Sequence, residues 1–573
     1  MTRTLSTGPI ANRDARSYKA AAVAALLLAM PHPLVAQVTP PALPRQSDIS
    51  RERVTLPVPE TPNFDLSIQA PERAAIPRAV DAVEFQVRAF VVEGATAFSA
   101  AQVDAFFTPL TGRTIGLEAV RDATAKLENL YRENGYFLSR VFVPPQQIEN
   151  ETLKIRVIEG YIGDLYVEGM DERSRAAVRR LLAPLLARKP IDLASVERRL
   201  LTLNDLPGIS GTSVLRQGAE TGASDLVVSL VQPRNFYQLS VNNSGSKILG
   251  PWGYGANANL NRPFNLPGVL NLGISAGGRK LEAVRTAIAR YSVALGSQGL
   301  IGSLGAIVAR AKPAGSLRPL DIQNDLLSVS ARGRYPIMRG RTQSLFAETG
   351  LSVNRSKTDI FGQELVDDRT TVGDVGLIYQ QSGWLDGATT ASVNYFQALP
   401  ILGAMEESAP LPSVLDFDAD FSRITVAIQR SQALPDNFSA LLSAQGQYTD
   451  SKLLSGELIS FGGPAIGRGY DPSAITGDRG LGALAELRYD APLSKSGFNN
   501  AQFYTFFDGA HTISLATPMV ERSTDRIRSL GAGVRLYHRY GLVDVQVADA
   551  QRRIGGSDAR SDPRFLISAA VVF

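Results

Sequence analysis

The most telling feature of this sequence is a deficit: it has no cysteine and only three histidines among 573 residues. Without cysteine, the chain can form no disulfide, no thiolate zinc site and no Cys-x-x-Cys redox pair. The histidines are far apart (His32, His511 and His538), so we expect no metal centre and no cofactor. Charge excess is also small, because 59 basic residues against 55 acidic ones leave +4, which predicts no nucleic-acid binding.

Long hydrophobic runs are lacking too, apart from a short one near the start. Arg13, Arg16 and Lys19 precede the apolar run 20–30, and Ala36 follows as a small residue at a plausible cleavage position. This pattern predicts a secretory signal peptide over residues 1–36, with a membrane anchor as the alternative. No later stretch has the roughly 18 consecutive apolar residues that a membrane helix needs. The chain is therefore expected to be exported, either as a soluble protein or as a membrane β-barrel.

Proline is concentrated in residues 37–81, where eight prolines occur. Proline lacks a backbone N–H and fixes its own φ, so this density resists helix and sheet alike. We interpret the segment as a linker or an extended arm.

Two α+β modules are predicted next, over residues 82–160 and 161–234. The clearest helix lies between Gly116 and Gly135, with its apolar positions on one face. Strands are expected at 139–148 and 151–160, where apolar and polar residues alternate in the second. In the second module, Asp192 is a candidate N-cap of a helix. Nothing in either module resembles a catalytic centre.

From residue 235 to Phe573 the sequence shows no helical period. Short segments instead alternate apolar with polar or very small residues, as in 481–490, 529–536 and 565–573. Runs of about ten such residues are typical of transmembrane β-strands, although a soluble β-sandwich or solenoid shares the alternation. The length of this region and the signal peptide favour a barrel. We predict a membrane β-barrel of 16 antiparallel strands at 235–573, an even number as bacterial barrels require.

Connection lengths support this assignment. If the two modules are periplasmic, connections after odd strands lie outside the cell, and these are mostly the long ones. They are predicted at 312–323, 355–368, 399–420, 451–479 and 552–563. Long outer loops and short periplasmic turns are the rule for such barrels.

The loop at 451–479 and the following strands contain the main candidate site. Arg468 stands between Gly467 and Gly469, and Asp508 shares a strand face with Phe506. A carboxylate facing lipid is costly, so Asp508 should face the barrel lumen and seek a cation there. Arg468 is a suitable partner, because its planar fork binds carboxylate with two hydrogen bonds. The alternative is that Asp508 binds a lumenal arginine of the wall, Arg488 or Arg535.

These residues give the chain a specific resemblance. The order of signal, arm, two modules and barrel resembles the two-partner secretion transporters of the outer membrane, the TpsB type that exports haemolysins and filamentous haemagglutinins. The segments 131–148 and 153–160 are similar to that family's first POTRA domain. Arg468-Gly469-Tyr470 matches the Arg-Gly-Tyr of its sixth outer loop, and Phe506-Phe507-Asp508 matches its Phe-x-Asp strand motif.

Two departures concern the fit of the loop: Ala510 replaces a glycine of the strand motif, and Gly467 replaces a β-branched residue before the arginine. The resemblance implies that the loop folds back into the lumen, where Arg468 would pair with Asp508. It also implies that the terminal Phe573 is a signal for insertion.

The resemblance further implies a location and partners. The protein would lie in the bacterial outer membrane, with outer-membrane lipid around its barrel and two POTRA domains in the periplasm. These domains would bind an unfolded exoprotein, a TpsA-like haemolysin or adhesin, by adding a strand to a sheet edge. The partner would cross the barrel without ATP. The barrel assembly machinery would be a partner during insertion.

Three alternatives differ from this interpretation. Outer-membrane assembly factors share the POTRA domains and the barrel, but they usually have more modules and a phenylalanine in place of Tyr470. A hydrolase is suggested by Gly273-Ile274-Ser275-Ala276-Gly277, but no helix follows the serine, as a nucleophile elbow requires. A passive porin would not need the two modules.

Overall fold

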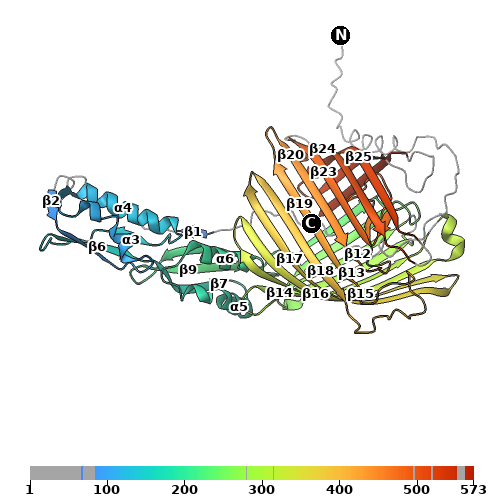
Figure 1. Ribbon diagram of the computed structural model, residues 1–573, viewed down its shortest axis with the longest axis horizontal. Coiled ribbons are helices and arrows are strands. Elements are labelled where there is room, and N and C mark those ends of the chain that lie inside the picture. Colours follow the sequence, from blue (N-terminus) through green and yellow to red (C-terminus); the bar gives the residue numbers. More distant parts are fainter. Residues whose placement is uncertain are drawn as a thin grey trace, which may run out of the picture. The chain divides into compact units, whose positions relative to one another are not determined.

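The structure is a computed structural model, shown in Figure 1. It describes residues 66–68, 84–278, 281–313, 315–493, 497–517, 521–551 and 562–573. The predicted signal peptide at 1–36 and most of the predicted outer loop at 552–563 lie outside the described residues.

The first module, at 84–158, has helix α4 packed on small sheets. Alternate positions of β6 and one face of α4 are apolar, so Leu127 and Tyr131 of the helix are buried with Ile155 of the strand. The strand predicted at 139–148 is shorter, because Pro144 and Pro145 end its ladder soon after Phe142. The elements are β2 (Glu84–Val87), β3 (Ala89–Glu93), α3 (Ala100–Asp104), η2 (Thr108–Leu110), β4 (Arg113–Gly116), α4 (Leu117–Glu133), β5 (Arg140–Phe142) and β6 (Thr152–Ile158).

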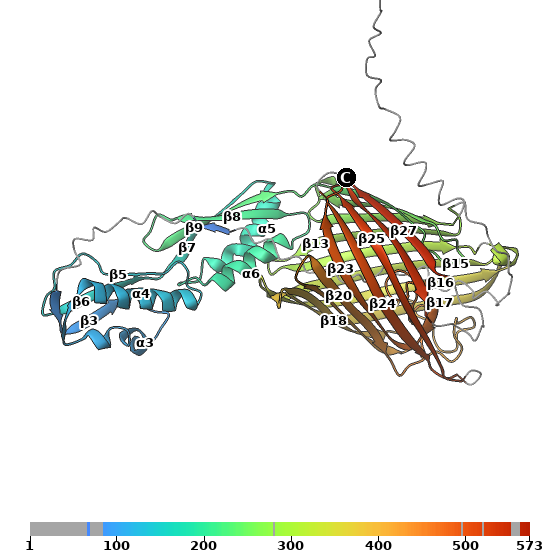
Figure 2. The ribbon, with the colours of Figure 1, turned by 90° about the horizontal axis from the view of Figure 1, so that it is seen from above.

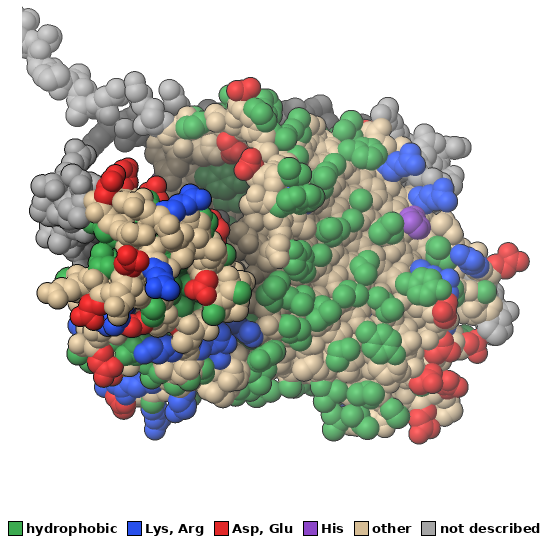
Figure 3. Space-filling model, turned by 60° about the vertical axis from the view of Figure 1, so that its left-hand side comes forward, with side chains coloured by type: hydrophobic (Ala, Val, Ile, Leu, Met, Phe, Trp, Pro, Cys, Tyr) green, Lys and Arg blue, Asp and Glu red, His purple; other side chains and the backbone are tan. Residues whose placement is uncertain are grey.

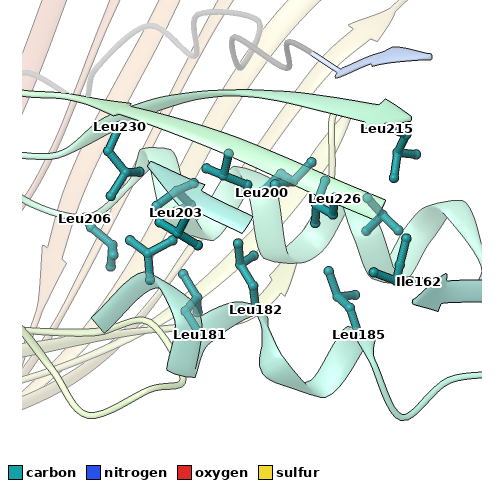
Figure 4. Close-up of a cluster of buried hydrophobic side chains, with 14 of the residues drawn as sticks. Ile162, Leu181, Leu182, Leu185, Leu200, Leu203, Leu206, Leu215, Leu226 and Leu230 are labelled. Atoms are coloured by element: carbon teal, nitrogen blue, oxygen red, sulfur yellow. The ribbon is translucent and has the colours of Figure 1, made fainter. Parts of the chain in front are cut away.

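The second module, at 161–231, packs two helices on one face of a sheet. Leucines from both helices and from the sheet fill its core, as Figure 4 shows. Asp192 is the N-cap of α6, as predicted, and accepts a hydrogen bond from the Ser195 N–H at 2.7 Å. None of the described helices is long and apolar enough to cross a membrane. The elements are β7 (Tyr161–Glu168), α5 (Glu172–Leu182), η3 (Ala183–Leu185), α6 (Leu193–Asn204), β8 (Ser210–Gln217) and β9 (Ala223–Val231).

The proline-rich arm contributes one short strand, contrary to the prediction that it would form neither helix nor sheet. Strand β1 (Leu66–Ile68) pairs in parallel with β8, at the edge of the second module's sheet. These three residues lie between Pro62 and Pro71, so their own N–H groups remain available for a ladder. Proline density alone therefore did not decide the structure of the arm.

Sixteen antiparallel strands of the described chain close a barrel, which confirms the predicted fold (Figures 1 and 2). The first strand, β10, pairs with the last strand, β27, and so leaves no open edge. The strands are β10 (Phe236–Asn242), β11 (Gly253–Asn261), β12 (Val269–Gly277), β13 (Val284–Leu295), β14 (Leu300–Ala311), β15 (Gln323–Arg339), β16 (Gln343–Ile360), β17 (Gln363–Trp384), β18 (Gly387–Ala398), β19 (Ser422–Ala433), β20 (Phe438–Tyr448), β23 (Arg479–Pro492), β24 (Asn500–Ser514), β25 (Ser523–His538), β26 (Gly541–Ala550) and β27 (Arg564–Val572).

The outer surface of the barrel is mostly apolar. Figure 3 shows one side of it, where hydrophobic side chains are spread over the middle of the wall among other uncharged groups, and charged ones gather at its right-hand edge. Outward-facing residues such as Ile274, Leu304 and Val375 are more than half exposed, as residues of a lipid-facing wall are in the isolated chain. Short 3₁₀ turns, η4 (Pro263–Asn265) and η5 (Gly315–Leu320), lie between strands.

One predicted outer loop is wrong. Segment 355–368 is mostly strand, because β16 and β17 continue into a hairpin that turns at Phe361-Gly362. Cross-strand ion pairs stabilise it: Arg355 binds Asp367 with its Nε at 2.8 Å, and Lys357 pairs with Glu364. The charged residues of this segment therefore join two strands.

Candidate functional site

A long loop between β20 and β23 packs against the inside of the barrel wall. It contains two short strands, β21 (Ile459–Phe461) and β22 (Ile475–Gly477), which pair with each other. Its apolar side chains Phe461 and Ile466 are buried with Phe506 and Ile527, which face inward from β24 and β25. The loop predicted at 451–479 is therefore folded into the lumen.

Glycines allow the loop tip to come close to the wall. Gly467 has a φ of +91°, a conformation that other residues rarely adopt. Gly469 lies against the main chain of β26, where a Cβ atom would be only 2.8 Å from the Ala550 nitrogen. The two glycines around Arg468 thus have different tasks, one in shaping the turn and one in permitting close contact.

Asp508 of β24 binds the loop through its main chain. Its Oδ1 accepts a hydrogen bond from the Gly467 N–H at 2.9 Å, and its Oδ2 accepts one from the Arg468 N–H at 3.2 Å. The Ser529 hydroxyl donates to Oδ1 as well. Asp508 is fully buried and faces the lumen, as predicted, while Phe503 and Phe507 face outward.

The predicted ion pair between Arg468 and Asp508 is wrong in its detail. The Arg468 guanidinium instead binds Glu486 of β23, with 2.8 Å between Nη1 and Oε2. It also lies over the ring of Phe506, 4.3 Å from the ring centre, in a cation–π contact. The reason is geometric: Asp508 is already occupied by two main-chain N–H groups, so the side chain extends to the next strand. The alternative pairing of Asp508 with Arg488 or Arg535 is not found among the described contacts either.

Glu486 is the centre of a buried charged network. Besides Arg468, it accepts hydrogen bonds from Arg488 and Arg535, both at 2.7 Å. Arg535 also binds Asp544, whose other oxygen accepts the Tyr504 hydroxyl at 2.6 Å. Three arginines thus bind the buried carboxylate of Glu486, and one of them also binds Asp544, so the negative charge of Glu486 is fully paired.

The base of the loop has anchors of its own. Asp478, which is fully buried, accepts hydrogen bonds from the Leu453 and Leu515 N–H groups and pairs with Lys452 at 3.0 Å. Further along the loop, Glu457 pairs with Arg423 of β19 at 2.9 Å. Tip and base are therefore held by separate contacts.

Tyr470 completes the tip. Its hydroxyl donates to the Arg528 carbonyl at 3.0 Å, and its own carbonyl accepts a hydrogen bond from Arg564 of β27. The four residues Gly467 to Tyr470 thus contact strands from β23 to β27. The predicted tip residues and the wall residues Phe506 and Asp508 are brought together as expected.

Glu486 is the residue that sequence reasoning missed. A signal was available, because Glu486 and Arg488 occupy the same alternating, inward-facing positions of 481–490 that revealed the strand. In the wall, Glu486 is directly opposite Phe506, one step from the pair Leu484 and Asp508. Sequence spacing alone cannot show which of two lumenal carboxylates this close together, Glu486 or Asp508, binds the Arg468 guanidinium.

A lumenal cavity of about 410 Å³ remains between the loop and the wall strands β10 to β13. Glycine, serine and asparagine dominate its lining, and no charged side chain lines it. Ser275 is one of the lining residues and lies within strand β12, in register with Gly255 and Thr286. A nucleophile elbow requires a sharp turn from strand to helix, so the Gly-x-Ser-x-Gly pattern has a structural origin here.

The last residue, Phe573, contributes to barrel closure. It exchanges two main-chain hydrogen bonds with Tyr237 of β10, at 2.9 and 3.0 Å, and the two rings stack with centres 5.9 Å apart. The Phe573 side chain is 62% exposed and faces outward.

Comparisons with known proteins agree with this architecture. The chain is 23% identical to the heme/hemopexin transporter protein HuxB of Haemophilus influenzae over 81% of this chain and 82% of that one. It is 24% identical to the hemolysin transporter protein HpmB of Proteus mirabilis, over 69% and 70%. Among solved structures, CdiB from Escherichia coli shares the fold, with a TM-score of 0.68 and 20% identity over 87% of this chain and 92% of that one.

Two family models match the chain itself. Residues 85–160 match the POTRA domain of the ShlB type. Residues 222–536 match the haemolysin secretion/activation protein ShlB/FhaC/HecB, and this match covers more than half of the chain. The protein therefore belongs to the ShlB/FhaC/HecB family of haemolysin secretion/activation proteins.

Proposed function

We propose that this protein exports an unfolded partner protein across the bacterial outer membrane through its barrel. The observation that carries this proposal is a closed barrel whose lumenal loop is held to the wall by discrete polar contacts, in a chain of the ShlB/FhaC/HecB family. The curated relatives are named as transporters, of hemolysin in one case and of heme/hemopexin in another. The partner of this chain would be a haemolysin-like or adhesin-like exoprotein.

The two α+β modules would lie in the periplasm and bind the partner there. The module at 161–234 would act as a second POTRA domain beside the one at 82–160. A sheet edge can bind an extended peptide through main-chain hydrogen bonds alone, which suits an unfolded partner of variable sequence. Strand β8 already accepts β1 in this way, so its edge is able to bind an added strand.

Passage through the barrel requires the loop to leave the wall. The cavity beside it has an uncharged lining of small residues, which would hold an extended chain without strong sequence preference. Asp508 and Glu486 of the wall bind the loop, and Asp478 of the loop binds Leu515 outside it, by hydrogen bonds that can form and break without covalent change. Folding of the partner outside the cell would provide direction without ATP.

Insertion of the barrel would depend on its last strand. Because Phe573 is exposed on the outer surface beside Tyr237, it is accessible to the barrel assembly machinery as a terminal aromatic signal. Once inserted, the apolar wall would be surrounded by outer-membrane lipid.

Export can be tested in a Gram-negative host that expresses this chain together with the exoprotein encoded beside it. We expect Arg468→Ala to reduce the secreted partner at least about tenfold, while the barrel still folds, as judged by heat-dependent gel mobility. Ser275→Ala is the control for the hydrolase alternative, since it removes one hydroxyl from the cavity lining and none of the contacts that hold the loop tip, and it should export normally. Normal export by Arg468→Ala would contradict the role of the loop, and loss of function in folded Ser275→Ala would favour an enzyme.

Strand addition at β8 can be tested separately. Ser67 and Val214 are in register between β1 and β8, so cysteines at both positions should form a disulfide in a chain that has no other cysteine. If the partner binds this edge, the oxidised variant should export poorly and recover with reductant. Equal export before and after reduction would exclude the β8 edge as the binding site.

A further inference from the structure

A groove of about 850 Å³ runs over the outer surface of the barrel across strands β10 to β15. Its floor follows from the register of the wall, because large and small side chains alternate along one outward-facing row. Reading across neighbouring strands, this row is Leu239, Ala256, Ile274, Ala287 and Val308. Because the alanine side chains are small, they leave space between the larger side chains of this row, and a hydrocarbon chain could occupy that space.

The outer end of the groove carries two arginines. Arg285 and Arg310 are directly opposite each other on β13 and β14, and both are exposed. Arg310 is bound to Asp325, with 2.6 Å between Nε and Oδ1. Arg285 donates from its Nε to the Leu281 carbonyl at 3.0 Å, and no described carboxylate lies within ion-pair distance of it.

Two like charges in directly opposed positions destabilise a pair of strands. Asp325 neutralises only one of them, so the pair retains a positive charge at the border of an apolar surface. An anion between the two guanidinium groups would offset this repulsion. Arginine also binds phosphate oxygens with paired hydrogen bonds, which a flexible ammonium group does less well.

The position of the pair restricts the anion. Strand β10 begins at Phe236, directly after the second module, so β13 begins at Val284 at the opposite end of the barrel wall. If the modules are periplasmic, as proposed above, Arg285 and Arg310 lie at the outer leaflet. The anion must then belong to a molecule that also has hydrocarbon chains, because the apolar groove begins one step below the arginines.

We propose that this groove binds one phosphorylated glycolipid of the outer leaflet, with an acyl chain over Ala287 and a phosphate between Arg285 and Arg310. The outer-leaflet position of the groove rests on the orientation given in the proposed function. The apolar floor and the two arginines of the groove do not depend on that orientation. The lipid would fix the outer ends of β13 and β14.

Binding can be measured with the purified full chain in uncharged detergent, by native mass spectrometry during titration with diphosphoryl lipid A. We expect Arg285→Gln to weaken binding about tenfold, since it removes a charged donor that has no carboxylate partner among the described residues. Ala287→Leu, which fills the channel and leaves both arginines, should weaken it as well. Arg526→Gln is the matched control, because Arg526 is exposed on the outward face of β25, away from the groove, and should change binding less than about twofold.

Three results would overturn the proposal. The first is that both groove variants, Arg285→Gln and Ala287→Leu, bind diphosphoryl lipid A as the wild type does. The second is that Arg526→Gln loses as much binding as Arg285→Gln, and the third is that the wild type binds fully dephosphorylated lipid A as tightly as the diphosphoryl form. Displacement of the lipid by inorganic phosphate at equal concentration would show a simple anion site instead of a lipid site. Heat-dependent gel mobility verifies that each variant is folded. The titration needs no exported partner, so it remains decisive if the proposed export fails, and export by a variant that cannot bind lipid would leave the proposed function intact.

Discussion

At the scale of single residues, two carboxylates divide the binding of the loop tip. Asp508 accepts the N–H groups of Gly467 and Arg468, whereas Glu486 binds the Arg468 side chain. Contacts to the main chain depend on the shape of the tip, and the contact to the guanidinium depends on one side chain. Binding of the loop tip therefore requires both the correct main-chain conformation and an arginine at position 468.

A double-mutant cycle separates these contributions. We expect Arg468→Gln and Glu486→Gln to be coupled by about 1.5–3 kcal/mol, the usual range for hydrogen bonds between charged groups. Arg468→Gln and Asp508→Asn should be additive within about 0.5 kcal/mol, because Asp508 binds main-chain atoms that the substitution leaves in place. The free energy of loop opening can be measured by hydrogen exchange at the amides of 463–470. Strong coupling to Asp508 and none to Glu486 would contradict the observed pairing.

Sequence reasoning reached this site almost completely, and the part it missed has a physical reason. Period-two alternation placed Asp508 and Phe506 on the lumenal face, and burial confirms it. Alternation fixes only the face of a strand. Whether the Arg468 side chain binds Asp508 or Glu486 depends on which of these carboxylates already accepts the loop's main-chain N–H groups. The amino-acid sequence alone does not show this.

At the scale of elements, close approach of the loop to the wall depends on Gly469. In Gly469→Ala the added methyl would lie 2.8 Å from the Ala550 nitrogen and 2.9 Å from the Asp549 carbonyl carbon, both main-chain atoms that cannot move aside easily. We expect a loss of about 1–3 kcal/mol in loop docking, measured by the same amide exchange. Gly509→Ala is a suitable control on β24, because its methyl would meet the Ile527 oxygen at 3.3 Å and should be tolerated. Equal exchange in the two variants would exclude close packing at the tip.

A second prediction at this scale concerns Glu159, which joins three elements of the first module. Its carboxylate accepts the Thr96 N–H at 2.6 Å, the Ala97 N–H at 2.8 Å and the Tyr131 hydroxyl at 2.8 Å. Burial alone would raise the pKa of Glu159, but the hydrogen bonds from Thr96, Ala97 and Tyr131 outweigh it and hold the pKa below its ordinary value.

Because the pKa of Glu159 is lowered by folding, its contribution to stability is complete above about pH 4.5, the ordinary glutamate value. The contribution is lost as the pH falls through the lowered folded pKa. We expect Glu159→Gln to cost about 1–3 kcal/mol at neutral pH and to flatten the acid dependence of amide exchange in the first module. Glu118→Gln, at an exposed position in the first turn of α4, should change stability by less than about 1 kcal/mol and keep the acid dependence. Retention of the wild-type acid dependence in Glu159→Gln would contradict this assignment.

The order of the elements was well predicted where one period dominates. Alternation predicted sixteen barrel strands, the number that closes the barrel. It failed at 355–368, where charged residues pair across a hairpin and so resemble a solvated loop. It also failed at 66–68, because a three-residue strand has no measurable period and forms only against the edge of β8.

At the scale of the whole molecule, an ion pair joins the second module to the barrel. Arg339, at the end of β15, binds Asp205 after α6 with both ends of its fork, at 2.6 and 2.9 Å. Arg262 pairs with Asp171 at a second point. If binding of the partner protein moves this module relative to the barrel, these contacts must break first. Removal of these ion pairs should therefore favour motion of the second module relative to the barrel, while the module and the barrel each stay folded.

We expect Arg339→Gln to weaken this junction by about 1.5–3 kcal/mol and to broaden the distances between spin labels on the module and on the barrel. Labels can be attached to cysteines introduced at Ser229 and Asp436, because the chain has none of its own. Arg341→Gln is the matched control: the Nη1 of Arg341 is 3.7 Å from Glu197 and its side chain is 55% exposed, so its loss should change the junction by less than about 1 kcal/mol. An unchanged distance distribution in Arg339→Gln, with a broadened one in the control, would show that Asp205 does not hold the module.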